Sequence, residues 1–209
     1  MQQYGHCENN LRNILITICY DGKNYHGWQV QDNAVTVQEV FQDAIHKVFK
    51  TKPDIKGCSR TDSGVHANMY CINVKVDSKI PCERIVAALN RFLPYDICVK
   101  DCREVPLDFH ARYSCIGKEY VYKIFNGRIR DPFLYGYALH YWYSMDIDKM
   151  RKAAQFYVGE HDFTSFCTLD KRNTVNMIRN VKKFEIDKID NIVEMRVEAD
   201  GFLYNMVRI

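Results

Sequence analysis

Alternating apolar and polar residues predict β-strands along most of the chain. Residues 13–20 show the pattern clearly, because Ile14, Ile16 and Ile18 fall on one side of an extended backbone. Alternation or a short apolar run also predicts strands at 54–58, 69–76, 97–105, 119–125, 177–186 and 192–199. Turn-forming residues such as Asp21-Gly22 separate the strands from the segments that follow them.

Apolar residues three and four apart predict amphipathic helices between the strands. Helices are expected at 36–49, 81–92 and 146–158, with the first turns of another at 202–209. Their expected start signals are Thr36 with Glu39 as a capping box, Pro81, and Asp146. Their expected stops are Pro53, Pro94 and Gly159.

The order of these elements predicts an α+β protein with two similar halves. The first half follows the order β-α-β-β-α-β, and the alternation then starts again. A boundary near Pro106 divides the chain into 1–105, which carries the polar loop described below, and 106–209.

Composition limits the functional classes. A chain of 209 residues with 47% hydrophobic residues can form a real core. It has no apolar run long enough for a transmembrane helix, and its polar start lacks the apolar core of a signal peptide, so we expect a cytoplasmic location. The nine cysteines include no C-x-x-C pair or zinc-type spacing, so we expect reduced thiols and no structural metal.

A basic and aromatic segment gives the first indication of a partner. The net charge of the chain is only +3, but residues 110–130 hold five cations and one anion, a local net of +4, with tyrosines between them. Cations neutralise phosphates and aromatic rings stack on bases, as a looped RNA site requires. The alternative is a solvated strand face above an aromatic core.

The polar loop 60–67 is the strongest candidate for chemistry. Asp62 lies there between two predicted strands, beside Arg60 and close to Gly64. Loops held by a rigid sheet often carry catalytic groups, and glycine permits close ligand approach. On these residues alone, the commoner role for such an aspartate is that of a turn residue that binds nearby backbone N–H groups.

Eight segments together resemble one family. They are Tyr20-Asp21-Gly22 with Gly27-Trp28-Gln29, Thr36-Val37-Gln38-Glu39, Arg60 to Ala67, Leu89-Asn90 with Leu93-Pro94, Phe109-His110-Ala111-Arg112, Lys118 to Tyr122, Gly159 to Phe163 with Ser165-Phe166, and Met206-Val207-Arg208. In this order they resemble the motifs of the tRNA pseudouridine synthase A family. The resemblance extends from about Leu11 to the last residue.

The resemblance implies a fold and an activity. It implies the pseudouridine synthase fold, two similar α/β-sandwich-like halves with mainly antiparallel sheets that flank a central active-site cleft. It implies that uridine is isomerised to pseudouridine in the anticodon stem-loop of tRNA, at positions thirty-eight to forty, without a cofactor. It also implies a homodimer in which one tRNA spans both subunits.

The resemblance assigns Asp62, Tyr120 and Arg208 to catalysis. Asp62 would act as a nucleophile or as a base, and the sequence does not choose between these routes. Arg208 would pair with Asp62, or it is a surface residue. Tyr120 would stack on the uracil and take part in the final proton removal, or it is a core tyrosine.

Residues expected to contact RNA or line the same cleft are Arg60, His66, Phe109, His110, Arg112 and Lys118. Arg60 has a competing interpretation as a salt-bridge partner of Asp62. His66 also has a competing interpretation, as a residue that forms hydrogen bonds within its own loop. Gly27, Trp28 and Gln29 are expected to serve packing and loop architecture rather than chemistry.

The chain ends just after Met206-Val207-Arg208, whereas family members continue, so we expect a truncated C-terminal half with weakened stability or activity. Two other functional classes compete with the leading one. The first is a non-catalytic RNA-binding protein on the same scaffold. The second is an unrelated hydrolase using Asp62, which is disfavoured because the sequence shows no metal set, Ser-His pair or phosphate-binding glycine loop.

Overall fold

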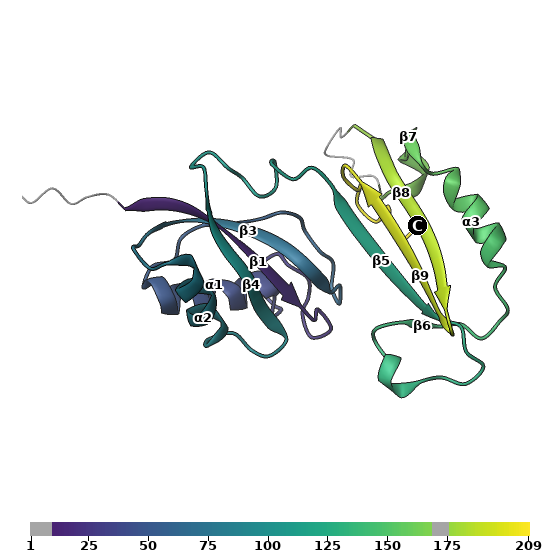
Figure 1. The fold of residues 1–209 in the computed structure, drawn as a ribbon, viewed down its shortest axis with the longest axis horizontal. Coiled ribbons are helices and arrows are strands. Elements are labelled where there is room, and N and C mark those ends of the chain that lie inside the picture. Colours follow the sequence, from purple (N-terminus) through teal and green to yellow (C-terminus); the bar gives the residue numbers. More distant parts are fainter. Residues whose placement is uncertain (1–9, 169–175) are drawn as a thin grey trace, which may run out of the picture. The chain divides into compact units, whose positions relative to one another are not determined.

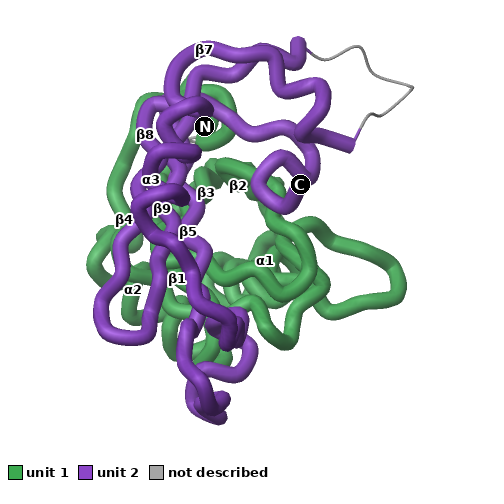
Figure 2. Tube along the Cα trace, turned by 90° about the vertical axis from the view of Figure 1, so that its right-hand side faces the viewer, with its two compact units in different colours: residues 1–115 green, residues 116–209 purple. Residues whose placement is uncertain are grey.

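The computed structural model describes residues 10–168 and 176–209, and the chain divides into two compact units, Met1–Cys115 and Ile116–Ile209 (Figures 1 and 2). The boundary lies about ten residues after the position near Pro106 that the sequence suggested. The assignment of 1–105 and 106–209 as domains stays a prediction.

The first unit is built on a four-stranded antiparallel sheet. Its strands are β1 (Leu11–Tyr20), β2 (Ile55–Gly57), β3 (Ala67–Asp77) and β4 (Ile97–Val105). Their spatial order is β2-β3-β1-β4, so the long strands β3 and β4 both pair with β1. Two helices, α1 (Val37–Phe49) and α2 (Cys82–Asn90), pack on this sheet through one shared apolar core.

That core contains the residues which the alternation assigned to one side of β1. Ile14, Ile16 and Ile18 are fully buried, and Phe41 and Ile45 of α1 are buried in the same cluster. Burying side chains of this size stabilises the fold by roughly 1.5–3 kcal/mol each. The core therefore fixes β1 as an interior strand of the sheet, between β3 and β4.

Both helices of this unit end earlier than their prolines suggest. Thr36 Oγ1 accepts the Glu39 N–H at 3.4 Å, as the capping signal predicts. However, α1 ends at Lys50, which adopts the left-handed conformation with φ 59°, so Pro53 does not stop it. The second helix ends at Asn90, whose side-chain amide exchanges two hydrogen bonds with the backbone of Val99 in β4.

The second unit contains a five-stranded sheet. Its strands are β5 (Lys118–Phe125), β6 (Leu139–His140), β7 (Gly159–Asp162), β8 (Ile178–Ile189) and β9 (Ile192–Ala199). Their order is β6-β5-β9-β8-β7, and every pair is antiparallel except β5 with β6. The unit also holds α3 (Ile147–Gln155) and two 3-10 turns, η1 (Pro132–Leu134) and η2 (Thr164–Phe166).

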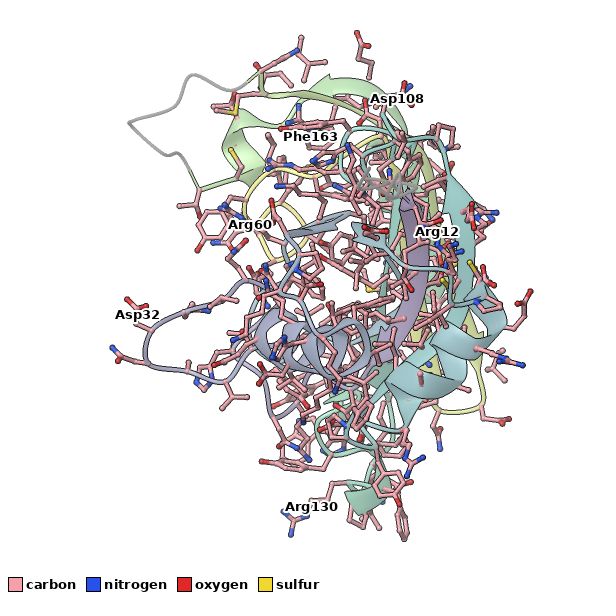
Figure 3. All side chains as sticks on the ribbon, turned by 90° about the vertical axis from the view of Figure 1, so that its left-hand side faces the viewer. Arg12, Asp32, Arg60, Asp108, Arg130 and Phe163 are labelled. Atoms are coloured by element: carbon pink, nitrogen blue, oxygen red, sulfur yellow. The ribbon has the colours of Figure 1, made fainter. Side chains whose placement is uncertain are left out.

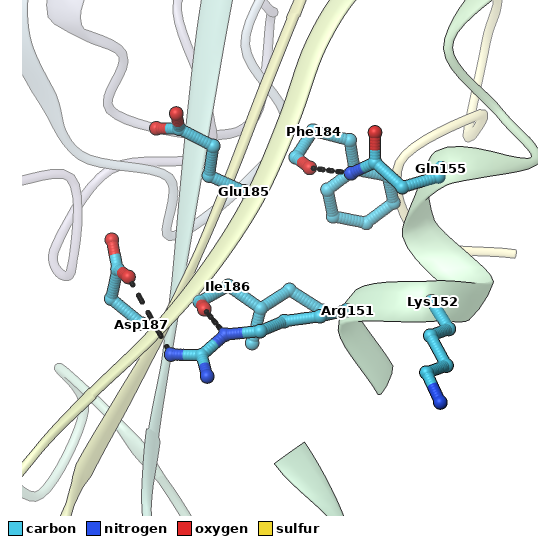
Figure 4. Close-up of a pocket in the computed structure, with 7 residues that line it drawn as sticks. All are labelled: Arg151, Lys152, Gln155, Phe184, Glu185, Ile186 and Asp187. Carbon is cyan, nitrogen blue, oxygen red and sulfur yellow. Dashed lines mark hydrogen bonds and ion pairs between the residues drawn. The ribbon is translucent and has the colours of Figure 1, made fainter. Parts of the chain in front are cut away.

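Helix α3 covers part of this sheet and protects its edge. It begins after Asp146, whose carboxylate accepts the Lys149 N–H at 3.0 Å, as predicted. Along β8, beyond the part that pairs with β7, Arg151 Nε donates to the Ile186 carbonyl at 2.8 Å and Gln155 Nε2 to the Phe184 carbonyl at 3.3 Å (Figure 4). These side chains line a shallow pocket of about 330 Å³ and satisfy carbonyls that the sheet leaves unpaired.

Three boundaries of the second unit differ from the sequence prediction. Helix α3 ends at Gln155, and Gly159, with φ 108°, starts β7 instead of ending the helix. The β8–β9 turn is confined to Asp190 and Asn191, since Asp187 already pairs in the ladder. Residues 202–209 form turns rather than a helix, because Asn205 has a φ of 61°, which a right-handed helix excludes.

The α+β class expected from the order of elements is confirmed, as are the mainly antiparallel sheets that the resemblance implies. Among the helices of residues 10–168 and 176–209, none combines the length and apolar character needed to cross a bilayer.

Candidate active site

The loop that carries Asp62 connects β2 to β3 in the first unit. Its tip is a tight turn, because the Val65 N–H donates to the Asp62 carbonyl at 3.2 Å. Gly64 lies in this turn with a φ of 76°, a backbone conformation that other residues rarely adopt. Asp62 and Arg60 are both exposed, so the loop presents its charged groups on the surface of this unit.

A second segment, 20–29, holds the loop from behind. The backbone N–H of Trp28 donates to the Thr61 carbonyl at 3.1 Å, and the Gly64 N–H donates to the Tyr25 carbonyl at 3.1 Å. A Cβ atom on Gly27 would lie 2.4 Å from the Thr61 carbonyl oxygen, so only glycine allows this approach. These contacts agree with the expectation that Gly27 and Trp28 serve loop architecture.

Side chains from the core strands support the start of the loop. The Tyr20 hydroxyl lies 2.9 Å from Thr61 Oγ1, and the Tyr70 hydroxyl donates to the carbonyl of Ser59. The Trp28 and Tyr70 rings are stacked with centroids 4.3 Å apart, and Gly57 leaves room for both. The residues that precede Asp62 are therefore fixed by buried aromatic groups.

His66 closes the other end of the loop. Its Nδ1 atom lies 2.9 Å from Asp21 Oδ1 and 3.2 Å from the Gly22 backbone nitrogen. One ring nitrogen cannot donate to the first and accept from the second at once, so the tautomer decides which bond forms. In either case the ring contacts the segment that supports the loop, and its predicted contact with RNA stays a prediction.

Tyr25 and Asp96 form a polar contact that sequence reasoning did not identify. The Tyr25 hydroxyl donates to Asp96 Oδ1 at 2.7 Å, and the Asp96 carbonyl accepts the Asp21 N–H at 2.8 Å. Burial, and next the hydrogen bond to Asp96, raise the pKa of the Tyr25 phenol well above its ordinary value. The only sequence signal for this contact was the position of Asp96, two residues after Pro94, at which a helix was expected to have ended.

The Phe109 to Arg112 segment forms a turn after β4, in the same unit as Asp62. Phe109 and His110 are half-buried, whereas Arg112 is exposed. The His110 ring stacks on Tyr113 with centroids 4.4 Å apart, and the Arg112 guanidinium carbon lies 5.9 Å from the Tyr113 ring centre. A cation and two aromatic rings gathered on one turn can bind phosphate and stack on a base.

The remaining candidates belong to the second unit. Tyr120 is half-buried on β5, with its ring packed edge-on against Phe202 at 4.9 Å between centroids. Lys118 begins the same strand, and Arg208 is exposed in the C-terminal turn, where its N–H donates to the Asn205 carbonyl. Because Asp62 belongs to the other unit, a meeting of Asp62 with Tyr120 and Arg208 stays a prediction.

Part of the basic segment is neutralised on the sheet. Lys123 Nζ lies 3.4 Å from Glu194 on the adjacent strand β9, and Arg196 binds both Glu194 and Glu119. These pairs make one face of the sheet a solvated ladder of opposite charges. For β5 they favour the alternative interpretation, a solvated strand face, over an RNA-binding surface. The turn at 109–113 therefore retains a stronger case for RNA contact than Lys123 does.

Within the described parts of the chain, no three His, Cys, Asp or Glu side chains come close enough to hold a metal ion. The cysteines described there are free thiols, and burial raises the pKa of Cys71, Cys98 and Cys102. The first unit alone thus offers a carboxylate, cations and aromatic rings on loops held by one sheet. Such a set can bind RNA and act on it by nucleophilic or acid–base chemistry.

Comparison with known proteins agrees with this class of site. The family model described as tRNA pseudouridine synthase matches residues 16–114 and 153–209. A tRNA pseudouridine synthase A of Thermoanaerobacter sp. (strain X514) is 46% identical over 199 residues, 95% of this chain and 81% of that protein. A protein of the same description from Caldicellulosiruptor saccharolyticus is 44% identical, with the same coverage.

The chain therefore belongs to the tRNA pseudouridine synthase family, and the resemblance drawn from its motifs is confirmed. The α+β fold is the pseudouridine synthase fold. Among solved structures, a chain in a crystal structure of a Cbf5-Nop10-Gar1 complex aligns with a TM-score of 0.38 and 13% identity. That alignment covers 90% of this chain and 49% of the other, and a similarity this low supports no conclusion about this chain.

Proposed function

We propose that this protein isomerises uridine to pseudouridine in the anticodon stem-loop of tRNA, at positions thirty-eight to forty, and that Asp62 is its catalytic carboxylate. The observation that carries the proposal is the position of Asp62 within a matched family motif on a rigid, exposed loop. The activity follows from membership of the family, and the choice of uridines from resemblance alone.

The reaction sets three physical tasks and leaves the composition of the substrate unchanged. The bond between uracil N1 and ribose C1′ breaks, the ring rotates and C5 bonds to C1′; the C5 proton is then lost to solvent while N1 takes up a proton. The base must first leave its stack, which costs a few kcal/mol and costs least in a loop. No step needs a redox change or a group donor, so we propose a reaction without a cofactor.

Asp62 begins the chemistry in either of two ways. As a nucleophile its carboxylate attacks the sugar or the base, and as a base it removes a ribose proton to start an elimination. Both routes need a carboxylate held in a fixed position. The hydrogen bonds and glycine contacts that hold Thr61 and Gly64 support this requirement.

We propose supporting roles for Tyr120 and Arg208 in the same site. Arg208 would pair with Asp62 and keep it ionised and aimed. The Tyr120 ring would stack on the extruded uracil, and its hydroxyl would assist the final proton removal. The edge-on contact with Phe202 supports this role, because it holds the phenol ring in one orientation on β5.

Candidates for RNA contact are Arg60, His66, Phe109, His110, Arg112 and Lys118. The clustering of His110 and Arg112 around Tyr113 supports this assignment most directly. Recognition would depend on shape and phosphate more than on base sequence. We also propose a cytoplasmic location, where tRNA is modified, and a homodimer.

The deciding experiment measures tritium release from C5-labelled uridine in tRNA, which binding alone cannot produce. We expect release by the unaltered protein and a loss of about 10³-fold or more for Asp62→Asn, with tRNA affinity retained. Asp32→Asn is the matched control, because Asp32 is an exposed carboxylate on the loop between β1 and α1, away from Arg60 (Figure 3). Near-normal release by Asp62→Asn would defeat the assignment, and binding without release by the unaltered protein would indicate a non-catalytic RNA-binding protein.

A further inference from the structure

Two asparagines are buried in the sheet of the first unit, where apolar residues are expected. Asn13 on β1 is 0% exposed and Asn73 on β3 is 3% exposed. Asn73 interrupts an apolar run, since both of its chain neighbours, Ile72 and Val74, are fully buried. A buried amide is costly unless all its polar atoms are bonded, so the partners of this pair show what the pair does.

The two amides bond to each other and to a single turn. Asn73 Nδ2 donates to Asn13 Oδ1 at 3.0 Å and to the Phe109 carbonyl at 3.3 Å. Asn13 Nδ2 donates to the Phe109 carbonyl at 3.0 Å and to the Pro106 carbonyl at 2.9 Å. Asn73 Oδ1 accepts the N–H of Ala111, itself buried, at 2.7 Å. Every polar atom of both side chains is used.

The pair therefore fixes the backbone of the turn at 106–111. Three backbone groups of the turn are bound to the sheet, and the bonds lie on both sides of His110 along the chain. The strand β3 that carries Asn73 is the same strand that follows the Asp62 loop. The turn and the catalytic loop thus share one rigid support.

The exposed end of this turn holds the His110, Arg112 and Tyr113 cluster. Tyr113 is 77% exposed, and the His110 ring stacks on it. His110 Nδ1 accepts the Arg112 N–H at 3.2 Å, which places the proton of a neutral ring on Nε2 and sets the orientation of the imidazole. Displacement of the turn would move these three side chains together.

We propose that Asn13 and Asn73 are positioning residues for tRNA binding, and that they act by holding the turn that presents His110, Arg112 and Tyr113 to the RNA. This inference rests on the proposed function, because it takes tRNA as the ligand of the cluster. The amides contact the turn and each other, so their effect reaches the RNA only through the turn.

The test compares Asn73→Ala with a matched control, Asn90→Ala. Asn90 also binds two backbone groups of the same unit, through its two bonds to Val99, but neither bond involves the turn at 106–111. We expect Asn73→Ala to raise the Kd for tRNA about tenfold, with kcat at saturating tRNA within twofold of the unaltered value. Asn90→Ala should lower the melting temperature and leave Kd unchanged.

A double-mutant cycle identifies the route of the effect. In a His110→Ala, Arg112→Ala, Tyr113→Ala background, we expect Asn73→Ala to raise Kd by less than twofold, because the three side chains that it positions are already gone. Independent, multiplicative effects would overturn the proposal, as would equal losses of affinity in Asn73→Ala and Asn90→Ala. Asn13→Ala, which keeps the bond to Ala111, should act in the same direction more weakly and serves if Asn73→Ala does not fold.

The outcome for this inference is separable from the outcome for the proposed function. If the unaltered protein binds tRNA but releases no tritium, the catalytic proposal fails and the Kd comparison still decides the role of the asparagines. If the unaltered protein is active and Asn73→Ala binds tRNA normally, only the positioning role fails.

Discussion

Trp28 donates its backbone N–H to the carbonyl oxygen of Thr61, 3.1 Å away, and so ties the residue before Asp62 to a segment more than thirty positions earlier in the chain. The loop that carries Asp62 is consequently held by tertiary contacts as well as by its own turn. Trp28 and Tyr25 of the 20–29 segment make these contacts through backbone groups. Substitutions there should therefore affect stability and catalysis together.

Gly27→Ala tests this link. The added methyl group would lie 2.4 Å from the Thr61 carbonyl oxygen, and the φ of 84° already disfavours alanine. Overpacking and backbone strain together predict a loss of about 3 kcal/mol in the free energy of unfolding. Because Thr61 is displaced, we also expect tritium release per folded molecule to fall at least tenfold. Urea unfolding and the release assay measure the two effects.

The control for Gly27→Ala is Gly64→Ala. Gly64 has a similar φ of 76°, but a Cβ atom there would meet no other atom within 4 Å. Only the strain of a left-handed residue remains, about 1 kcal/mol. Equal destabilisation by the two substitutions would show that the close approach of Gly27 to Thr61 does not support the loop.

Tyr25→Phe tests the contact with Asp96 through its pH dependence. The folded state raises the pKa of Tyr25 above its unfolded value of about 10, because burial and the Asp96 carboxylate disfavour the phenolate. The stabilisation is therefore complete below pH 10 and is lost as the pH rises above it, since the unfolded chain then binds fewer protons. At pH 7 we expect Tyr25→Phe to cost about 1 kcal/mol.

Above pH 10 the free energies of unfolding of the two proteins should converge. The thiols of Cys98, which is exposed, and of Cys102, which is buried, also have raised pKa values, but their effect is common to both proteins and cancels in the difference. Urea unfolding between pH 8 and about 11.5 measures this difference. A constant difference across that range would contradict the proposed stabilisation of the neutral phenol.

Sequence reasoning located the elements whose burial is periodic. The bounds of β4 and β9 agree with the prediction residue for residue, because their alternation matches sheets with one buried face. The short edge strands β6 and β7 were missed. Leu139–His140 is too short to show a period, and Gly159–Asp162 is polar and pairs only because β8 lies beside it.

The same distinction explains the site. Asp62 was identifiable because its motif is local in the sequence. The residues that support its loop, Tyr25, Gly27 and Asp96, are distant in the sequence, and no local pattern reveals that they pair with the loop or with each other. Asn73 did leave a signal, an amide inside an apolar strand, but only coordinates show that its partner is the turn at 106–111. The end of α1 at Phe49 was predicted correctly, although the left-handed Lys50 follows it well before Pro53, whereas α2 and α3 end two and three residues earlier than predicted.

Arg112→Ala and Lys123→Ala should separate the two parts of the basic segment. The part of the chain that the structure describes contains no anionic partner within 4 Å of Arg112, whereas Lys123 lies 3.4 Å from Glu194. A cation already neutralised within the sheet gains little from a phosphate. We expect Arg112→Ala to weaken tRNA binding about tenfold and to reduce the slope of log Kd against log salt by about one.

Lys123→Ala should change neither the affinity nor that slope measurably. Fluorescence titration with tRNA from 50 to about 300 mM salt measures both quantities. The reverse result, with binding dependent on Lys123 and indifferent to Arg112, would move the RNA surface from the turn at 109–113 to the β5 sheet face.

The segment 128–143 should carry the interface of the proposed homodimer. Eight of its large apolar or aromatic side chains are each more than 40% exposed, among them Phe133, Tyr135 and Trp142. The segment is nevertheless ordered, because Asn126 Nδ2 donates to the carbonyls of Tyr141 and Tyr143. A rigid patch of this kind exceeds what monomeric proteins usually expose, and aromatic residues dominate the binding energy of interfaces.

Tyr135→Glu should therefore convert the dimer to a monomer at micromolar concentration. A buried charge in place of a central aromatic residue costs more than about 2 kcal/mol, at least a thirtyfold rise in the dimer dissociation constant. Light scattering after size-exclusion chromatography measures the mass. Phe156→Glu is the matched control, since Phe156 is 82% exposed in the same unit but lies outside this segment. A monomeric unaltered protein, or equal dissociation by both substitutions, would exclude the segment as the dimer interface.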